Sequence, residues 1–414
     1  MTISAEEGLG YQRDGLLTDG SPLRDRWLVN ASNPVRYEVR FSQDLLHPDN
    51  PALADAGAPG TGSGTGCRRF LVVDSNVHER YGSRITGYLE ARGIGYEVCV
   101  IVAHEQLKTM DSVFRVLSAM DDFGLARRRE PVIAVGGGVL TDIVGVAAGM
   151  YRRSTPYVRV PTTLIGMVDA AVGAKTGINL GRHKNRLGSY HPSVVTLIDP
   201  AFLRSLHTRH LSNGLAEILK IALIKDRDLF DLLAEHGSRL AEEHFRHEGS
   251  ADGGAAAATV LRRAIHGMLE ELQSDLWERE LRRLMDYGHS FSPTIEMEAL
   301  PALLHGEAVC VDMAFTTLLA RRRGLLGAEE YRRIIALMHA LDLPTWHPLC
   351  TPELLSRALA DTVRHRDGRQ HIPLPVGIGR GCFVDDLTDV ELADTAAQFR
   401  HEHALRAAVG GDHD

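Results

Sequence analysis

The sequence predicts an α/β protein of two domains, with a Rossmann-like parallel sheet first and an all-helical domain after it. Up to about residue 200, short apolar runs alternate with amphipathic helical stretches, which is the pattern of β-α-β units. Beyond Pro200 the strand signals cease, and the pattern is helical to about residue 345, with a break at HEGSADGG (247–254). The expected segments are an N-terminal arm at 1–34, a sheet domain at 35–200 and a helical domain at 201–414.

The elements of the sheet domain follow in chain order. A loop rich in Gly, Ala and Pro, 54–66, separates a strand signal at 37–42 from the next strand. The later strands are the apolar runs at 70–74, 96–102, 131–135, 157–163 and 194–199. The helical stretches between them fall at 77–93, 106–125 and 140–151. Near-continuous apolar runs of this kind are typical of strands that are buried on both faces.

Composition limits the kinds of function. The 414 residues, 44% hydrophobic and 24% charged, have room for two domains and ample core. A formal charge of −8 argues against nucleic acid or an anionic membrane as a partner. The five cysteines form no CxxC pair, and the sequence shows neither a signal pattern nor an apolar run of membrane-spanning length. We therefore expect a cytoplasmic protein.

Lysine is scarce, and its positions are informative. Only five of the 46 basic residues are lysines, namely Lys108, Lys175, Lys184, Lys220 and Lys225. A compact ammonium directed at one oxygen has a role that a planar guanidinium cannot fill. For any single lysine, chance clustering or a buried stem with an exposed head is the alternative. As a set, the lysines indicate an enzyme that handles an oxygen-rich, phosphorylated substrate.

A nucleotide signal follows the strand at 131–135. Gly136, Gly137 and Gly138 lead from it into a helix, where glycines allow close approach of a pyrophosphate to the free N–H groups of the helix N-terminus. This is not the GxGxxG fingerprint, so the signal is weak alone. Asp74, at the carboxyl end of the strand at 70–74, is placed to hold a ribose hydroxyl. The alternative role for Asp74 is the N-cap of the following helix.

Three residues of the helical half suggest a cation site. Glu217 shares a helix face with Lys220, and His289 and His305 each stand beside a glycine. Two imidazoles and a carboxylate are the ligand set of an open catalytic zinc site. Because the chain has twenty histidines, ordinary structural roles for these two remain an alternative.

A series of motifs resembles the sugar-phosphate cyclases of the 3-dehydroquinate synthase superfamily. The resemblance extends over about residues 68–380 and rests on VVDSNV, EQLK, GGGVLTD, VPTTLIGMVDAAVGAKTGIN, HKN, NGLAEILK, DYGHS and LHGEAV, in that order. It implies a two-domain architecture of dehydroquinate synthase type, which is usually homodimeric, with NAD in the sheet domain and a metal in the helical domain.

The resemblance also implies site residues. Residues around NAD would be Asp74, Asn76, Glu105, Lys108, Gly137, Gly138, Asp142, Thr162, Thr163 and Lys184. Glu217, His289 and His305 would hold Zn²⁺, with Co²⁺ as an alternative metal. Residues that line the substrate would be Asp169, Lys175, Asn185, Lys220 and Arg282, with Arg153 reaching the phosphate either within one subunit or across a dimer interface.

Departures from the dehydroquinate synthase pattern concern the substrate. Met268 replaces a lysine, Asp286 replaces an asparagine, and Pro293 replaces a second histidine. The C-terminal pair of lysines is replaced near His365 by residues other than lysine. In the family the two missing lysines help to bind a carboxylate, and a buried carboxylate without partners costs several kcal/mol, as a rough estimate. A substrate without a carboxylate is the natural inference.

Such a substrate indicates the sedoheptulose 7-phosphate cyclases, and Leu272, Asp286 and His365 resemble the 2-epi-5-epi-valiolone synthase type. The implied reaction is cyclisation of sedoheptulose 7-phosphate through transient oxidation by NAD⁺, β-elimination of phosphate, re-reduction and aldol closure. Such enzymes supply the C7-cyclitol pathways of validamycin and acarbose. The candidate catalytic residues are Asp169, Lys175, Lys220 and Asp286, and we expect both carboxylates to be ionised.

Three other functions remain open. A 3-dehydroquinate synthase could use arginines such as Arg364 or Arg366 in place of lysine. A metal-dependent polyol dehydrogenase shares the two-domain plan but would consume NAD⁺ and need no phosphate site. A non-catalytic sugar-phosphate binder would have no use for an open metal site.

Overall fold

The computed structural model describes residues 15–17, 28–31, 33–57, 67–181, 183–246 and 251–410. They belong to two compact units, Met1–Tyr37 and Glu38–Asp414. In the first unit, strands β1 (Gly15–Leu17) and β2 (Leu28–Asn30) pair antiparallel. The rest of the predicted arm up to residue 27, and most of the predicted loop at 54–66, lie outside the described residues.

The second unit contains the predicted parallel sheet. Within the described residues, its strands follow the spatial order β3-β10-β7-β6-β4-β5, and every neighbouring pair is parallel. The strands are β3 (Glu38–Phe41), β4 (Arg68–Asp74), β5 (Gly95–Ile101), β6 (Val132–Gly136), β7 (Tyr157–Pro161) and β10 (Val195–Ile198). The helices between them are α1 (Ser75–Ala91), α2 (Met110–Asp122) and α3 (Gly138–Met150), with a short 3₁₀ turn, η1 (Glu105–Leu107).

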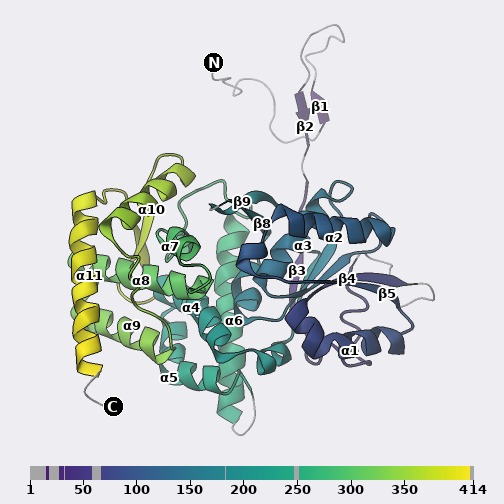
Figure 1. The fold of residues 1–414 in the computed structure, drawn as a ribbon, viewed down its shortest axis with the longest axis horizontal. Coiled ribbons are helices and arrows are strands. Elements are labelled where there is room, and N and C mark those ends of the chain that lie inside the picture. The colour runs from purple at the N-terminus through teal and green to yellow at the C-terminus, as the bar shows by residue number, and fades with distance from the viewer. Residues whose placement is uncertain are drawn as a thin grey trace. The chain divides into compact units, whose positions relative to one another are not determined.

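Strand β4 shows why the apolar run predicts this sheet. Successive side chains of a strand point to opposite faces. Leu71 and Val73 belong to the core on the side of α1, whereas Phe70 and Val72 belong to the core under α2 and α3. Figure 1 shows α1 on one face of the sheet and α2 and α3 on the other. Both faces are therefore covered, which confirms the α/β prediction.

A polar hairpin that the sequence did not predict follows β7. After a single π-helical turn, η2 (Gly166–Ala170), strands β8 (Lys175–Leu180) and β9 (His183–Tyr190) pair antiparallel. The hairpin packs on α3, where an added Cβ at Gly145 would lie 2.3 Å from Thr176 Cγ2. Because β9 is largely exposed and polar, no apolar alternation signals it.

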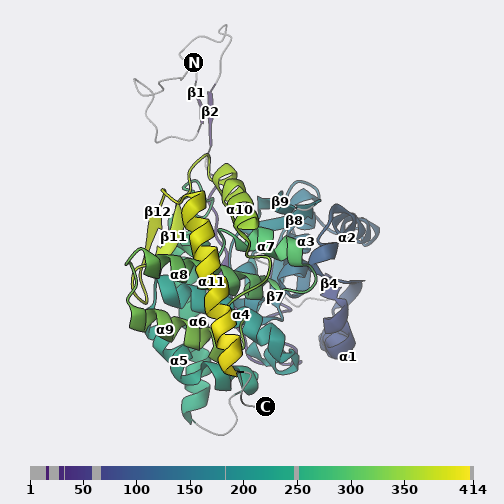
Figure 2. The ribbon, with the colours of Figure 1, turned by 60° about the vertical axis from the view of Figure 1, so that its left-hand side comes forward.

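The helical half begins after β10. It contains η3 (Pro200–Ser205), α4 (Thr208–Ile224), α5 (Arg227–Glu242), α6 (Ala251–Ser274), η4 (Leu284–Asp286), α7 (Ser292–Ala299), α8 (His305–Arg322), α9 (Ala328–Ala340), α10 (Pro352–His365) and α11 (Asp389–Gly410). Helix α11 packs against α8 and α10 (Figure 2). A short antiparallel pair, β11 (Ile372–Pro375) and β12 (Gly381–Val384), interrupts the helices, so this half is not all-helical. Residues 251–254 of the predicted break are helical, and 247–250 lie outside the described residues.

Helices α4 and α8 form the centre of this half. Residues Leu211–Ile224 of α4 and Gly306–Ala320 of α8 are buried, including polar members such as Glu217 and Asp312. Buried charged groups need specific partners. These two helices are therefore where a functional site is expected.

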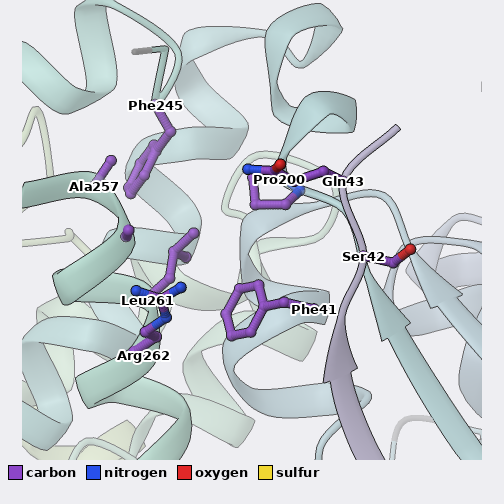
Figure 3. Close-up of a pocket in the computed structure, with 9 residues that line it drawn as sticks. Phe41, Ser42, Gln43, Pro200, Phe245, Ala257, Leu261 and Arg262 are labelled. Atoms are coloured by element: carbon purple, nitrogen blue, oxygen red, sulfur yellow. The ribbon is translucent and has the colours of Figure 1, made fainter. Parts of the chain in front are cut away.

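One pocket lies elsewhere. A cavity of about 370 Å³ opens between the end of β3, the start of η3 and α6, and Phe41, Phe245 and Leu261 line it with Arg262 (Figure 3). None of the residues that line it is a predicted site residue. Across the described part of the chain, the helices are too short or too polar to span a bilayer.

Candidate metal and substrate site

The predicted metal ligands meet at one point. Glu217 comes from the middle of α4, His289 from the loop before α7, and His305 from the first position of α8. Their ligand atoms lie within 4.8 Å of one another. Nε2 of His305 is 3.4 Å and Nε2 of His289 is 3.8 Å from Oε1 of Glu217. The edge of a tetrahedron with metal–ligand bonds of about 2.1 Å is roughly 3.4 Å, so these positions suit zinc.

The glycine beside each histidine has a steric reason. Gly288 has φ +74°, and an added Cβ would lie 2.8 Å from Met313 Cγ of α8. At Gly306, an added Cβ would lie 2.0 Å from the carbonyl oxygen of Asn213 on α4. Both glycines therefore allow the backbones that carry His289 and His305 to approach the neighbouring helices closely.

A buried carboxylate orients His305. Glu296 of α7 lies 2.8 Å from Nδ1 of His305 through Oε2, and Lys184 Nζ donates to both Glu296 oxygens at 2.8 and 2.6 Å. A carboxylate that accepts from Nδ1–H leaves the lone pair of Nε2 directed at the metal position. Glu296 was not predicted from the sequence. The Nζ atom of Lys184, a residue predicted to bind NAD, contacts this carboxylate and lies 2.8 Å from His305 Nδ1.

The charges of this cluster suit a cation. Burial, with Lys220 nearby, lowers the pKa of His289 to about 3, so its ring is neutral. Burial and Lys184 oppose charge on His305, but Glu296 and Glu217 raise its pKa to about 9. Burial alone would raise the pKa of Glu217, yet Lys220 and both histidines lower it well below its usual value. The buried Glu217 carboxylate lies at ion-pair distance from Lys220 and from both histidines, and neither of its oxygens has a hydrogen-bond partner among the described residues. The donor set therefore fits a divalent metal.

The predicted catalytic residues surround the cluster. Lys220 Nζ is 2.5 Å from Glu217 Oε2, and Glu217, Asp169 and Asp286 raise its pKa against the effect of burial. Burial and Glu217 raise the pKa of Asp169. For Asp286, burial is outweighed by Arg283, Arg366 and Lys175, which lower its pKa. The pKa of Asp169 is thus raised and the pKa of Asp286 is lowered.

Two arginines reach Asp286: Arg283, which the sequence did not indicate, and Arg366, which it offered only as a replacement for lysine in a 3-dehydroquinate synthase. Arg283 Nη1 lies 3.7 Å from Asp286 Oδ1, and the buried Arg366 donates to Oδ2 at 3.3 Å. By contrast, the predicted Arg282 is exposed and stacks 4.7 Å from the ring centroid of Phe383. Sequence spacing alone could not separate adjacent arginines, because their orientation depends on the turn into η4.

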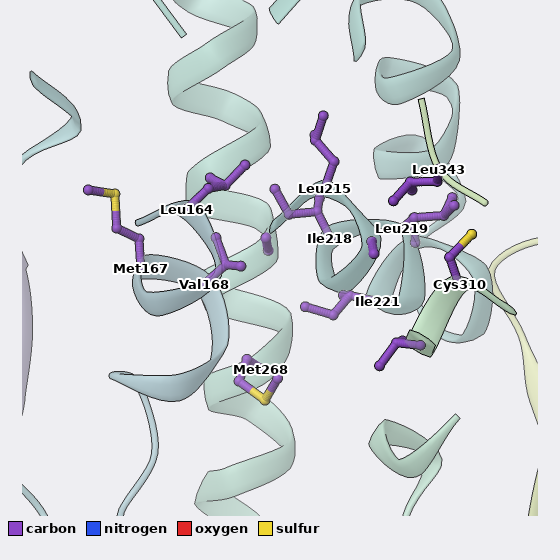
Figure 4. Close-up of a cluster of buried hydrophobic side chains, with 14 of the residues drawn as sticks. Leu164, Met167, Val168, Leu215, Ile218, Leu219, Ile221, Met268, Cys310 and Leu343 are labelled. Carbon is purple, nitrogen blue, oxygen red and sulfur yellow. The ribbon is translucent and has the colours of Figure 1, made fainter. Parts of the chain in front are cut away.

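Other predicted substrate residues fall into three groups. Met268 and Leu272 of α6 are buried in an apolar cluster, where Met268 lies with Val168 and Ile221 (Figure 4). Pro293 occupies the first turn of α7, where a missing N–H is tolerated. His365 is exposed at the end of α10, and Arg153 is exposed with φ +61° in the turn after α3.

The predicted nucleotide residues gather at the carboxyl ends of β4 and β6. An added Cβ at Gly137 would lie 3.1 Å from Thr163 Cγ2, and one at Gly138 would lie 2.9 Å from Ala170. Glycine at both positions therefore lets Thr163 and Ala170 pack closely against the turn that leads into α3. Thr162 is buried next to this turn, and its N–H donates to Gly136 O at 3.0 Å.

Asp74 has the structural role that was given above as the alternative to binding a ribose hydroxyl. It is the N-cap of α1, and it accepts from the N–H of Asn76 at 2.9 Å and of Ala103 at 3.2 Å. Asn76 also donates through Nδ2 to Asp74 Oδ1 at 3.2 Å.

A polar chain joins the remaining nucleotide residues to the hairpin. Lys108 Nζ lies 2.5 Å from Asp142 Oδ2 and donates to Asn185 Oδ1 at 2.6 Å. Asn179 donates to Glu105 Oε1 at 2.9 Å, and its own Oδ1 accepts from the N–H of Asn185 at 2.8 Å. The predicted NAD residues Glu105, Lys108 and Asp142 are thus connected through the hairpin to the predicted substrate residue Asn185.

A parallel sheet with a glycine turn, joined to a helical half with one carboxylate and two imidazoles, defines a metal-dependent enzyme of the dehydroquinate synthase type. The chain belongs to the sugar-phosphate cyclases of the 3-dehydroquinate synthase superfamily. The family model for the 3-dehydroquinate synthase N-terminal region matches residues 98–213, and that for the C-terminal region matches 214–364.

Two relatives and one solved structure are similar to this chain over nearly its whole length. The chain is 57% identical over 383 residues to a 2-epi-5-epi-valiolone synthase of Streptomyces hygroscopicus subsp. jinggangensis, covering 91% of this chain and 92% of the relative. It is 58% identical over 386 residues to one of Actinoplanes sp., covering 93% and 96%. A solved structure of the Streptomyces enzyme with NAD⁺ and Zn²⁺ bound superposes with a TM-score of 0.86 at 55% identity, over 91% of this chain and all of that one.

Proposed function

We propose that this protein is a 2-epi-5-epi-valiolone synthase, which converts sedoheptulose 7-phosphate into 2-epi-5-epi-valiolone and phosphate. The observation that carries the proposal is the identity of 57% and 58% to enzymes of this name over more than nine-tenths of the chain. The site supports it independently. Met268, where dehydroquinate synthases have lysine, lies in a buried apolar cluster with Val168 and Ile221. A buried apolar side chain at this position supplies no cation for a carboxylate.

The cofactors follow from the same comparison. In the proposed enzyme, Glu217, His289 and His305 hold Zn²⁺, and the turn at Gly137 and Gly138 receives NAD⁺. When bound, NAD⁺ accepts and returns a hydride at one carbon, and zinc polarises the sugar oxygens there. We also propose that 35–200 is the NAD-binding domain and 201–414 the metal-binding domain, with 1–34 as an arm.

The chain's own residues divide the acid–base work. Asp169, whose pKa burial and Glu217 raise, is the weaker acid of the two carboxyl groups and the candidate to exchange a proton with a sugar oxygen. Asp286, kept ionised by Arg283 and Arg366 although burial opposes this, accepts hydrogen bonds from sugar hydroxyls. Lys220 remains a cation and orients Glu217. Lys175, Asn185 and Arg153 bind the phosphate in this proposal.

Assembly and compartment are part of the proposal. We expect a cytoplasmic homodimer, in which Arg153 of one subunit reaches the substrate of the other. Its exposure in the turn after α3 supports such a role, and the five free cysteines suit a reducing compartment. Light scattering gives the mass in solution, and a monomer would contradict this part.

The decisive experiment follows phosphate release from sedoheptulose 7-phosphate, with Zn²⁺ and a catalytic amount of NAD⁺. A parallel reaction contains the C7 acid phosphate that dehydroquinate synthases use. We expect phosphate from the sugar alone without net NADH, and NMR of the product identifies its stereochemistry. Phosphate from the acid alone would make the protein a 3-dehydroquinate synthase. Net NADH without phosphate would make it a polyol dehydrogenase.

A further inference from the structure

The loop between α6 and η4 places an acidic side chain between two cations. Lys175 Nζ of β8 and Arg283 Nη1 both contact the same oxygen, Oε1 of Glu278. The hydroxyl of Tyr190 lies 3.3 Å from the other oxygen, Oε2. An ammonium and a guanidinium that converge on one oxygen can bind a phosphoryl oxygen as well as a carboxylate oxygen.

The two cations come from different halves of the second unit. Lys175 is the first residue of the hairpin in the sheet half, and its charge contributes to lowering the pKa of Asp286. Arg283 precedes η4 and lies 3.7 Å from Asp286. The pair therefore lies beside the group of residues around the candidate metal site, where a substrate held by the metal would extend.

The loop that carries Glu278 is held in an unfavourable backbone conformation. Glu278 has φ +49°, a left-handed conformation that costs about 1 kcal/mol or more for a residue with a side chain. The Asp275 carboxylate accepts from the N–H of Arg279 at 2.9 Å and of Glu280 at 2.8 Å, which makes the loop compact. The ion pairs of Glu278 with Lys175 and Arg283 offset this cost. An anion that competes for these two cations would therefore release the loop.

We propose that Lys175 and Arg283 bind the phosphoryl group of the substrate, and that Glu278 occupies this site until the substrate displaces it. The inference rests on the proposed function, and it adds Arg283 as a phosphate ligand and Glu278 as an internal competitor. An internal competitor lowers the apparent affinity for every anion by the fraction of time for which the site is free. It therefore weakens retention of the phosphate product as well as of the substrate.

The test measures binding of inorganic phosphate to the enzyme loaded with NAD⁺ and Zn²⁺, by titration calorimetry. Glu278→Gln removes the competing charge, and we expect phosphate to bind about tenfold more tightly. Glu280→Gln makes the same change of charge at an exposed position in the same loop, and we expect wild-type affinity. Arg283→Gln, in the Glu278→Gln background, should weaken phosphate binding again by about tenfold.

Opposite results would overturn the inference. If Glu278→Gln weakens phosphate binding, Glu278 is a scaffold that positions the two cations, and not a competitor. If Glu278→Gln behaves like Glu280→Gln, the site is elsewhere. Because inorganic phosphate binding needs no turnover, these outcomes are independent of whether sedoheptulose 7-phosphate is the substrate.

Discussion

At the scale of the residue, His305 should couple zinc binding to pH. Burial and Lys184 oppose its charge, yet Glu296 and Glu217 raise its pKa to about 9, and zinc requires the neutral ring. His289, with a pKa of about 3, has no proton to release at neutral pH. Each zinc ion therefore displaces about one proton below pH 9. We expect the apparent zinc affinity to rise about tenfold per pH unit between about pH 6.5 and 8.5. Competition with a chelating dye measures this, and an affinity independent of pH would contradict it.

Glu296 should contribute to zinc affinity without touching the metal. Glu296→Gln removes the charge that accepts from His305 Nδ1, and it leaves Lys184 without its buried partner. We expect zinc to bind about 10- to 100-fold more weakly, as for other carboxylates behind a metal-bound histidine. The control is Glu298→Gln, on the same helix, where the half-exposed side chain pairs only with Arg357 among the described residues. Equal zinc affinities for the two variants would exclude a positioning role for Glu296.

At the scale of the element, the site depends on the close approach of α4 and α8. Gly306→Ala places a methyl group 2.0 Å from Asn213 O, so α8 must shift and carry His305 with it. We expect a loss of about 1–3 kcal/mol in the free energy of unfolding, together with weaker zinc binding. Chemical denaturation and dye competition report the two effects.

Gly87→Ala in α1 is the matched control, because nothing lies within 4 Å of an added Cβ there. Alanine in an open helical position should stabilise the fold by about 0.5–1 kcal/mol and leave zinc affinity unchanged. A stable, zinc-competent Gly306→Ala variant would show that α8 tolerates displacement.

At the scale of the whole molecule, the metal should act as a cross-link of the helical half. Its ligands come from α4, the segment before α7 and the start of α8, so zinc binds only the folded chain. Zinc at a hundred times its dissociation constant should stabilise the fold by about 2.7 kcal/mol. A chelator should therefore lower the melting temperature by several degrees. Glu217→Gln should melt at the same temperature with and without chelator, and a shift in this variant would place the metal elsewhere.

The sheet and the helical half were predictable from the sequence alone. The apolar runs at β4 and β6 and the periodic helices carry their burial in the local pattern, which can be interpreted without the tertiary structure. The metal ligands could also be predicted from the sequence, because the order of the motifs and the flanking glycines indicated them. The β8–β9 hairpin carried no such pattern, since its strands alternate too weakly and expose polar side chains.

Which charged groups meet could not be predicted from the sequence and is seen only in the folded chain. Glu296 lies behind His305, Glu278 lies between Lys175 and Arg283, and Arg283 rather than Arg282 faces Asp286. Neighbouring charges likewise give Asp169 and Asp286 pKa shifts of opposite direction, although burial raises both: Glu217 adds to the rise at Asp169, and Arg283 and Arg366 outweigh it at Asp286. The physical reason is that electrostatic pairing depends on distance and desolvation in three dimensions. Residues such as Lys184 and Glu296 are 112 positions apart in sequence, and no local pattern records that they meet.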